Sequence, residues 1–252
     1  MIRADGLAKQ FEAVRARGVP PAVVHAVREV SFVAEDGRVT GLLGPNGAGK
    51  TTTLRMISTL VAPSAGTASV DGRDVRTDAL AARARLGMLS DARGLYARLT
   101  ARENITYYGE LRGMPAPDIR DSITRLAGWL DLADILDRRT EGFSQGERMK
   151  VAIARILVHD PPNVVLDEPT NGLDVMTTRS LREVIRRLRD DGKCVLFSSH
   201  VMQEVSALCD EILIIARGVV VARGRAEELL AVSGRDTLEE AFVALTGTAE
   251  PA

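Results

Sequence analysis

The sequence predicts an α/β fold built on a mostly parallel, doubly wound sheet. Three short apolar runs, at 164–166, 194–197 and 212–215, are typical of buried parallel strands. A helical pattern of apolar residues, from Leu181 to Leu188, lies between the first two runs. Strand, helix and strand in that order favour a parallel sheet that packs helices on its faces.

The first seventy residues favour strands separated by glycine turns. The β-like runs are Val27–Phe32, Arg38–Leu43 and Ala68–Val70. Helical patterning begins at about Asp91 and continues to Leu157. The chain is therefore expected to change from strands to helices and back to strands.

Composition is that of an ordinary globular chain. The 252 residues can bury a sizeable core, and 45% of them are hydrophobic and 27% charged. A net charge of -1 gives no field that favours nucleic acid or an anionic membrane. No apolar run approaches the roughly 18–20 residues of a spanning helix, and the start lacks a secretory signal. Cys194 and Cys209 are predicted to be reduced core residues, and the chain is expected to be cytoplasmic.

A phosphate-binding loop is predicted at 44–51. The residues match G-x-x-x-x-G-K-[ST], directly after a strand and at the start of a helix. Backbone N–H groups of such a loop cradle phosphates, Lys50 reaches the β- and γ-phosphates, and Thr51 ligates Mg²⁺. A mere glycine-rich turn with a surface lysine would not explain why motif, strand and helix coincide. We expect ATP to contact Gly44, Pro45, Asn46, Gly47, Ala48, Gly49, Lys50, Thr51 and Thr52.

Two carboxylates, Asp167 and Glu168, end the apolar run at 164–166. At the carboxyl end of a parallel strand beside a phosphate loop, Asp167 is placed to hold Mg²⁺. Glu168 lies one residue further, so that it can face the attacking water as a general base. Without the loop upstream, such a pair would indicate only a helix cap or a solvated turn.

His200 follows the next apolar run, at the same predicted edge of the sheet. A lone histidine is more often a satisfied surface or core residue, but ligand groups collect at this edge. There it can donate a hydrogen bond to the γ-phosphate. His25 and His159 have no comparable setting and receive no role.

A second anion site is predicted at 143–147, Phe-Ser-Gln-Gly-Glu. It precedes an amphipathic helix from Arg148 to Leu157, and N–H groups at a helix N-terminus point outward unpaired. The same residues also read as a helix cap, with Ser144 as the capping residue and Glu147 at the capping-box position. Both interpretations can hold together.

Several motifs together resemble those of the ATP-binding subunits of ABC transporters. The match covers nearly the whole chain, and the sequence in and around the motifs looks most like that of the sodium-exporting NatA-type subunits and their ABC-2-type export relatives. The motifs occur in the family's order: Walker A at 44–51 (GPNGAGKT), the signature loop at 143–147 (FSQGE), Walker B at 164–169 (VVLDEP), the D-loop at 171–174 (NGLD) and the switch histidine in 198–200 (SSH).

The resemblance implies the family's fold and a division of labour between the two anion sites. The fold is a P-loop core in one domain, 1–247, with an N-terminal antiparallel β subdomain, an inserted helical subdomain at about 91–157, and a disordered tail at 248–252. Two subunits pack head to tail, so that each nucleotide lies between Walker A of one and the signature of the other. The signature and D-loop residues that would contact nucleotide are Ser144, Gln145, Gly146 and Asp174.

Three positions test how closely the chain follows the family's pattern. Asp91 stands at the glutamine of the Q-loop, and we expect it to reach Mg²⁺ or its water. Glu147 replaces a glutamine, and phosphates would repel its carboxylate unless the side chain turns away. Phe11 matches the aromatic residue that stacks on adenine, and the alternative is a buried strand aromatic.

Competing functions explain less of the sequence. ABC ATPases that act on DNA carry long coiled coils between their halves, those that act on ribosomes carry two tandem domains, and neither feature is seen here. A P-loop kinase would leave FSQGE and SSH without a role. We therefore expect an ATPase that uses ATP and Mg²⁺ to power export of a substrate, either sodium or a drug-like compound. Its partners would be separate transmembrane permease subunits at the inner face of the membrane and a second copy or similar ATPase subunit, with no nucleic acid.

Overall fold

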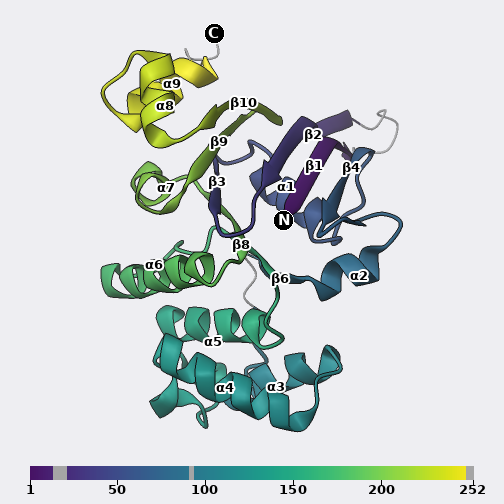
Figure 1. Ribbon diagram of the computed structural model, residues 1–252, viewed down its shortest axis with the longest axis vertical. Coiled ribbons are helices and arrows are strands. Elements are labelled where there is room, and N and C mark those ends of the chain that lie inside the picture. Colours follow the sequence, from purple (N-terminus) through teal and green to yellow (C-terminus); the bar gives the residue numbers. More distant parts are fainter. Residues whose placement is uncertain (14–21, 91–93, 248–252) are drawn as a thin grey trace.

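The computed structural model describes residues 1–13, 22–90 and 94–247. The strands found there are β1 (Ile2–Ala13), β2 (Ala22–Ala34), β3 (Val39–Leu43), β4 (Ala65–Val70), β5 (Arg73–Asp74), β6 (Leu86–Leu89), β7 (Asn163–Asp167), β8 (Cys194–Ser199), β9 (Glu211–Ala216) and β10 (Val219–Gly224). They form a sheet in the order β5-β4-β1-β2-β10-β9-β3-β8-β7-β6 (Figure 1).

The helices lie around this sheet in separate groups (Figure 1). Their bounds are α1 (Lys50–Ile57), α2 (Ala79–Ala84), α3 (Ala101–Leu111), α4 (Ala116–Leu130), α5 (Gln145–Leu157), α6 (Val175–Asp190), α7 (Met202–Leu208), α8 (Ala226–Ser233) and α9 (Leu238–Thr246), with short 3₁₀ turns at Ala133–Ile135 and Thr140–Gly142. Helices α3, α4 and α5 form a separate layer beyond α6, and α8 and α9 lie at the opposite end of the molecule.

The sheet has a parallel part and an antiparallel part. Strands β9, β3, β8, β7 and β6 are parallel neighbours, whereas β1 pairs antiparallel with β2 and with β4. Strand β10 joins the two parts, because it is antiparallel to β9 and pairs with β2 through Val219 and Glu29. The predicted fold class, a mostly parallel sheet with antiparallel N-terminal strands and an added helical layer, is confirmed.

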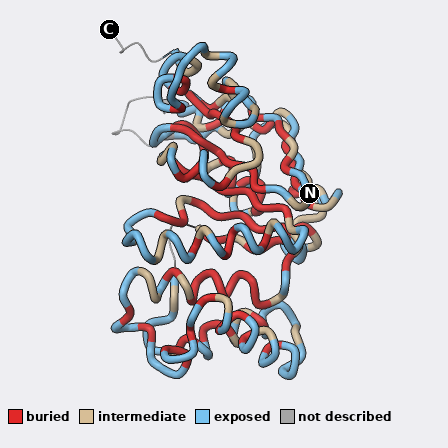
Figure 2. The backbone as a smooth tube through the Cα atoms, turned by 60° about the vertical axis from the view of Figure 1, so that its left-hand side comes forward, coloured by how far each residue is buried: buried red, intermediate tan, exposed pale blue. Residues whose placement is uncertain are grey.

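The parallel strands are buried on both faces, as a doubly wound sheet requires. Along β3, Leu42 belongs to the core under α1, and its neighbour Leu43 belongs to the core on the other face. In β8, Leu196 and Phe197 divide in the same way, since successive side chains point to opposite faces. These strands run as continuous buried segments between layers whose outer surfaces are exposed (Figure 2).

Each predicted strand overlaps an observed strand, although Arg38 lies one residue before β3, and β1, β5, β6 and β10 were not predicted. The helix expected from Arg148 begins earlier, at Gln145, and the first helix of the expected 91–157 stretch begins at Ala101. Asp91, the proline-containing loop before Val27 and the tail 248–252 lie wholly or largely outside the described residues.

Cys194 and Cys209 are both free thiols, as predicted. Burial raises the pKa of the Cys194 thiol to about 12, so it is protonated at neutral pH. In the part of the chain that the structure describes, no helix combines the length and apolar character needed to cross a bilayer.

Candidate functional site

The predicted phosphate loop runs from the end of β3 to the start of α1 and passes close to neighbouring backbone. At Gly49, φ is +105°, and a Cβ atom would lie 2.6 Å from the Ala26 carbonyl oxygen. At Gly44, a Cβ atom would lie 2.3 Å from the Ile215 carbonyl oxygen. Glycine is therefore required at both positions, because any side chain would collide with β2 or β9.

Lys50 folds back over this loop and is almost completely buried, at 5% exposure. Its Nζ donates to the carbonyl oxygens of Gly44 at 2.7 Å and Pro45 at 3.3 Å. The same Nζ forms an ion pair with Glu168 Oε1 at 3.1 Å. The Lys50 ammonium, which is expected to bind the β- and γ-phosphates, is thus held at the loop by the Glu168 carboxylate.

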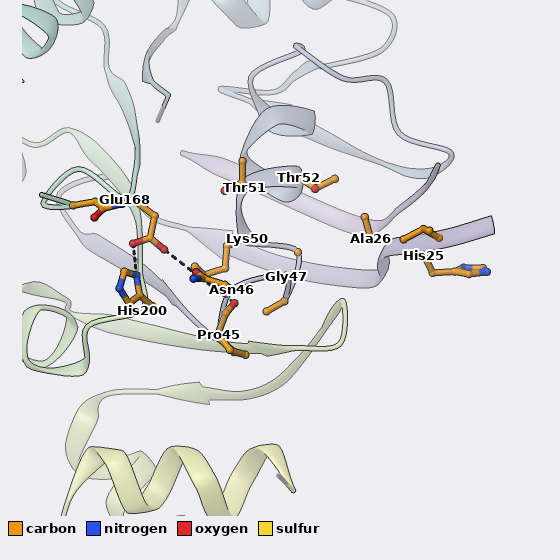
Figure 3. Close-up of a pocket in the computed structure, with 14 residues that line it drawn as sticks. His25, Ala26, Pro45, Asn46, Gly47, Lys50, Thr51, Thr52, Glu168 and His200 are labelled. Carbon is orange, nitrogen blue, oxygen red and sulfur yellow. Dashed lines mark hydrogen bonds and ion pairs between the residues drawn. The ribbon is translucent and has the colours of Figure 1, made fainter. Parts of the chain in front are cut away.

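Glu168 connects the phosphate loop to His200. Its second oxygen, Oε2, lies 2.8 Å from His200 Nδ1, so the carboxylate lies between the ammonium and the imidazole (Figure 3). Strand β7 ends at Asp167, and Glu168 has a φ of +46°, in the left-handed region that residues with side chains seldom adopt. Strained backbone of this kind clusters at functional sites.

Asp167 has the surroundings of a cation ligand. Its Oδ1 accepts hydrogen bonds from Thr51 Oγ1 at 3.1 Å and Ser198 Oγ at 2.7 Å. Its Oδ2 is buried and, among the described residues, has no hydrogen-bond partner. Burial raises the pKa of this carboxyl, and a bound cation would offset that cost. Mg²⁺ takes one or two carboxylate or hydroxyl ligands and completes its shell with phosphates and water, so Asp167 and Thr51 fit it.

Ser198 is a site residue that the sequence analysis did not single out. Its hydroxyl donates to Asp167 and accepts from the backbone N–H of Glu168 at 2.9 Å. One buried hydroxyl on β8 therefore fixes both the Asp167 carboxylate at the end of β7 and the backbone of Glu168, which follows it.

A cavity of about 550 Å³ brings the predicted residues together, a size suited to a nucleotide. Four lining residues were not predicted: Val24, His25, Ala26 and Asn171. The first three lie on β2, which reaches the cavity only through tertiary pairing; His25, given no role from sequence, is among them. The predicted residues that line it are Pro45, Asn46, Gly47, Ala48, Gly49, Lys50, Thr51, Thr52, Glu168 and His200.

The FSQGE loop is a helix cap, as one of the two interpretations predicted. Ser144 Oγ accepts from the Glu147 backbone N–H at 3.1 Å, and the Glu147 carboxylate accepts from the Ser144 N–H at 2.8 Å. Arg138 donates to the same carboxylate at 3.0 Å. The backbone bond from Ser144 and the charge of Arg138 lower the pKa of Glu147. Glu147, which stands at the family's glutamine position, therefore directs its carboxylate to the N-terminus of its own helix.

The loop also contacts the start of α6. The Gln145 side chain lies over Gly172, and a Cβ atom at Gly146 would come within 2.8 Å of Thr177 Oγ1. Asp174 caps α6 by accepting from the N–H of Thr177 at 2.9 Å, and this bond lowers the pKa of Asp174. Ser144, Gln145, Gly146 and Asp174 do not line the cavity that holds Lys50.

Phe11 lies on β1 opposite Val24, which lines the cavity. It is 43% exposed, so the alternative of a buried strand aromatic is wrong. Lys9 Nζ lies 5.1 Å from the centre of its ring. Stacking on adenine stays a prediction, as does metal binding by Asp91, which lies outside the described residues.

Sequence comparisons identify relatives over most of the chain. The ABC transporter family model matches residues 27–171. The ABC transporter ATP-binding protein NatA of Bacillus subtilis is 46% identical over 88% of this chain and 90% of its own length. The linearmycin resistance ATP-binding protein LnrL of the same organism is 34% identical over 84% of this chain and 68% of its own length.

Solved structures share the fold over nearly the full length. The structure of an ATP-binding subunit of an ABC transporter superposes with a TM-score of 0.86 at 26% identity, over 98% of this chain and 99% of that one. The ATP-binding cassette MJ0796, solved as a dimer in a post-hydrolysis state with ADP and Pi, gives a TM-score of 0.79 at 23% identity, over 89% of this chain and 98% of that one.

Proposed function

The chain belongs to the ABC transporter ATP-binding proteins, and we propose that two copies close on two ATP molecules to power export through separate membrane subunits. The chain is an ABC transporter ATPase. The proposal concerns what each residue does, how the copies are arranged, and what is moved.

One observation supports this arrangement of two copies: the two proposed anion sites of the chain do not share a cavity. Lys50, Glu168 and His200 converge on one cavity, whereas Ser144 is exposed and lies outside it. The Ser144 hydroxyl accepts one bond and, among the described residues, donates none. It can therefore donate to a phosphate that does not belong to its own cavity. A second copy would supply that phosphate as part of the nucleotide bound at its phosphate loop.

Within one copy, Lys50 binds the β- and γ-phosphates in place of the Glu168 carboxylate. Once Lys50 has exchanged partners, Glu168 is free to orient and deprotonate the attacking water as a general base. His200, now 2.8 Å from Glu168, is close enough to turn and donate to the γ-phosphate. The ion pair thus keeps both groups near their proposed places of action.

Thr51 and Asp167 would hold Mg²⁺, which neutralises phosphate charge when it is bound. Ser198 then has the task of presenting the Asp167 carboxylate, because its hydroxyl fixes Oδ1 and leaves Oδ2 unpaired. Asp91 and Phe11 are proposed to add a metal or water contact and an adenine contact, respectively. Gln145, Gly146 and Asp174 join Ser144 in the half-site offered to the other copy.

Export is proposed from the kind of relatives found. LnrL is a linearmycin resistance protein by name, which supports a drug-like compound. Sodium is supported only by the resemblance of the motifs to those of the sodium-exporting subunits. Residues 1–247 would act as one ATP-binding domain, with 91–157 as its helical part. Permease subunits would hold the chain at the inner face of the membrane.

The test is to purify the chain from membranes with whatever integral protein accompanies it and to assay the pair in vesicles. ATP-dependent uptake of sodium or of a linearmycin-like compound into inverted vesicles, lost in Glu168→Gln, is the expected result. A chain that copurifies with no membrane protein and hydrolyses ATP at an unchanged rate in membranes and in solution would contradict the proposal.

A further inference from the structure

Glu204 is a buried carboxylate that the mechanism above does not use. It lies in the first turn of α7, at 6% exposure, four residues after His200. Charged side chains are seldom buried unless they are paired or hydrogen-bonded, so its contacts indicate its role.

Two hydroxyls from different strand ends donate to one oxygen of Glu204. Thr170 Oγ1 lies 2.5 Å from Oε2, and Ser199 Oγ lies 3.2 Å from the same atom. Thr170 is 8% exposed and Ser199 is fully buried. Ser199 Oγ in turn accepts from the Val201 backbone N–H at 2.9 Å. A directed chain of hydrogen bonds therefore joins the segments that leave β7 and β8.

These segments carry the two groups proposed to act during hydrolysis, Glu168 on the attacking water and His200 on the γ-phosphate. Thr170 lies inside the turn that the Asn171 N–H closes onto the Glu168 carbonyl at 3.2 Å. Ser199 is the residue directly before His200, and Val201 is the residue directly after it. Glu204 thus holds both backbones within reach of the 2.8 Å contact between Glu168 and His200.

We propose that Glu204 is a positioning residue for hydrolysis, which fixes the Glu168 turn against the His200 loop. The inference rests on the proposed roles of Glu168 and His200. Both side chains must change partners when nucleotide binds, and Glu204 confines that change to side chains by keeping the backbones in place. Without its carboxylate, two buried hydroxyls lose their acceptor and the segments separate.

The test compares Glu204→Ala with Glu204→Gln in the full-length chain. Misplacement of reacting groups by about 1 Å can cost roughly 100-fold in rate, so we expect kcat of Glu204→Ala to fall about tenfold or more. The affinity for a fluorescent ATP analogue should stay within about twofold, since Lys50 and its loop make no contact with Glu204. Glu204→Gln keeps an oxygen that accepts both hydroxyls and should restore most of kcat.

Gln203→Ala is the matched control. Gln203 is the neighbouring residue on α7 and is exposed, and its side chain donates to Glu239 at 2.6 Å on the surface. It should hydrolyse ATP like the parental chain. An unchanged kcat in Glu204→Ala, or a fall in kcat matched by an equal fall in affinity, would overturn the role proposed for Glu204.

Thr170→Val keeps the test decisive if Glu204→Ala does not fold. It removes one donor but keeps the branched shape, and we expect a several-fold loss of kcat at unchanged affinity. Where Glu204→Ala folds, adding Thr170→Val to it should cause little further loss of kcat, because both substitutions remove the same hydrogen bond. An unchanged kcat in Thr170→Val overturns the inference. If hydrolysis is instead insensitive to Glu168→Gln, the proposed role of Glu168 fails and the inference fails with it, a result distinct from failure at Glu204 alone.

Discussion

The two loops that precede α1 and α5 occupy the same kind of position, directly before a helix, but have opposite surroundings. Each leads into a helix N-terminus, where N–H groups favour anions. Before α1, Gly44 and Gly49 are buried against other strands, and Lys50 is 5% exposed. Before α5, Ser144 and Gln145 are exposed, and the polar groups of the cap satisfy one another.

The comparison indicates that the tertiary surroundings of each loop, more than its local sequence, determine what the loop can bind. The first loop carries its own cation, Lys50, and finds its carboxylates and its histidine at the ends of β7 and β8, at one edge of a parallel sheet. The second finds none of these, and its carboxylate Glu147 is occupied by Arg138 and by the helix N-terminus. In the proposed function, the first loop binds phosphate within one chain, whereas the second loop needs another chain to complete its site.

The largest expected effect comes from removing the base beside the first loop. In Glu168→Gln, kcat should fall by about 100- to 10,000-fold, because general-base catalysis contributes that much. ATP should still bind, since the amide leaves Lys50 free for the phosphates. Steady-state hydrolysis and equilibrium binding measure the two effects. Glu183→Gln, an exposed change on α6, is the control, and a parental rate in Glu168→Gln would show that Glu168 is not the base.

The second-largest effect is expected from removing Lys50, which separates the contribution of its charge to ATP binding from that of the backbone N–H groups in the same loop. Lys50→Ala should weaken ATP binding about 10- to 100-fold, which corresponds to the roughly 1.5–3 kcal/mol of a hydrogen bond to a charged group. Hydrolysis should fall with it. Isothermal titration with ATP measures the loss, and Lys193→Ala, whose Nζ pairs with Asp160 at 2.9 Å, is the control. Unchanged binding by Lys50→Ala would place the phosphates elsewhere.

The first loop and the strands β3, β7, β8 and β9 could be predicted because their signals are local. A glycine motif, an apolar run and the residue that ends a strand are all read within about ten residues. Ser198 and Glu204 could not be predicted as site residues, because their meaning depends on which strands become neighbours. Val24 and His25 reach the cavity through the pairing of β1 and β2, and no short-range pattern reports that pairing.

The second loop could be predicted only as two alternatives. The residues of FSQGE predict a capping box and an anion site equally well, since both use the N–H groups at the start of the helix. The structure confirms the cap and shows the Glu147 carboxylate accepting hydrogen bonds from the Ser144 N–H and from Arg138. Whether the same residues also bind the phosphate of a second copy stays a prediction, because it concerns an interface between chains.

A mixing experiment tests that interface directly. In a Glu168→Gln background that blocks hydrolysis, Lys50→Ala chains are mixed with Ser144→Arg chains, each type with its own tag. Neither type alone has an intact shared site, whereas the heterodimer has one, formed by the Lys50 loop of the Ser144→Arg chain and the FSQGE loop of the other. We expect ATP to be retained in heterodimers isolated through both tags.

The control for mixing places both substitutions in one chain. Its heterodimer with the Glu168→Gln parent has no intact site and should retain no nucleotide. Light scattering gives the oligomeric state, and filtration gives the bound ATP. If complementary chains retain no more ATP than the control, with the membrane partner present as well as absent, the two loops do not share a nucleotide.

The smallest effect asks whether Ser144 does more than cap its helix, and the chain offers a matched cap for comparison. At the start of α3, Thr100 accepts from the Glu103 N–H at 3.1 Å, and its own N–H donates back to the Glu103 carboxylate at 2.7 Å. Ser144 and Glu147 repeat these bonds at 3.1 and 2.8 Å. Ser144→Ala and Thr100→Ala should therefore each lower the free energy of unfolding by about 1 kcal/mol, measured by urea denaturation. Only Ser144→Ala removes a hydroxyl that faces the exposed side of the FSQGE loop, so it alone should weaken ATP-driven dimerisation in the Glu168→Gln background, by roughly tenfold for one lost hydrogen bond to a charged phosphate. Equal dimerisation by the two variants would leave Ser144 a cap and nothing more.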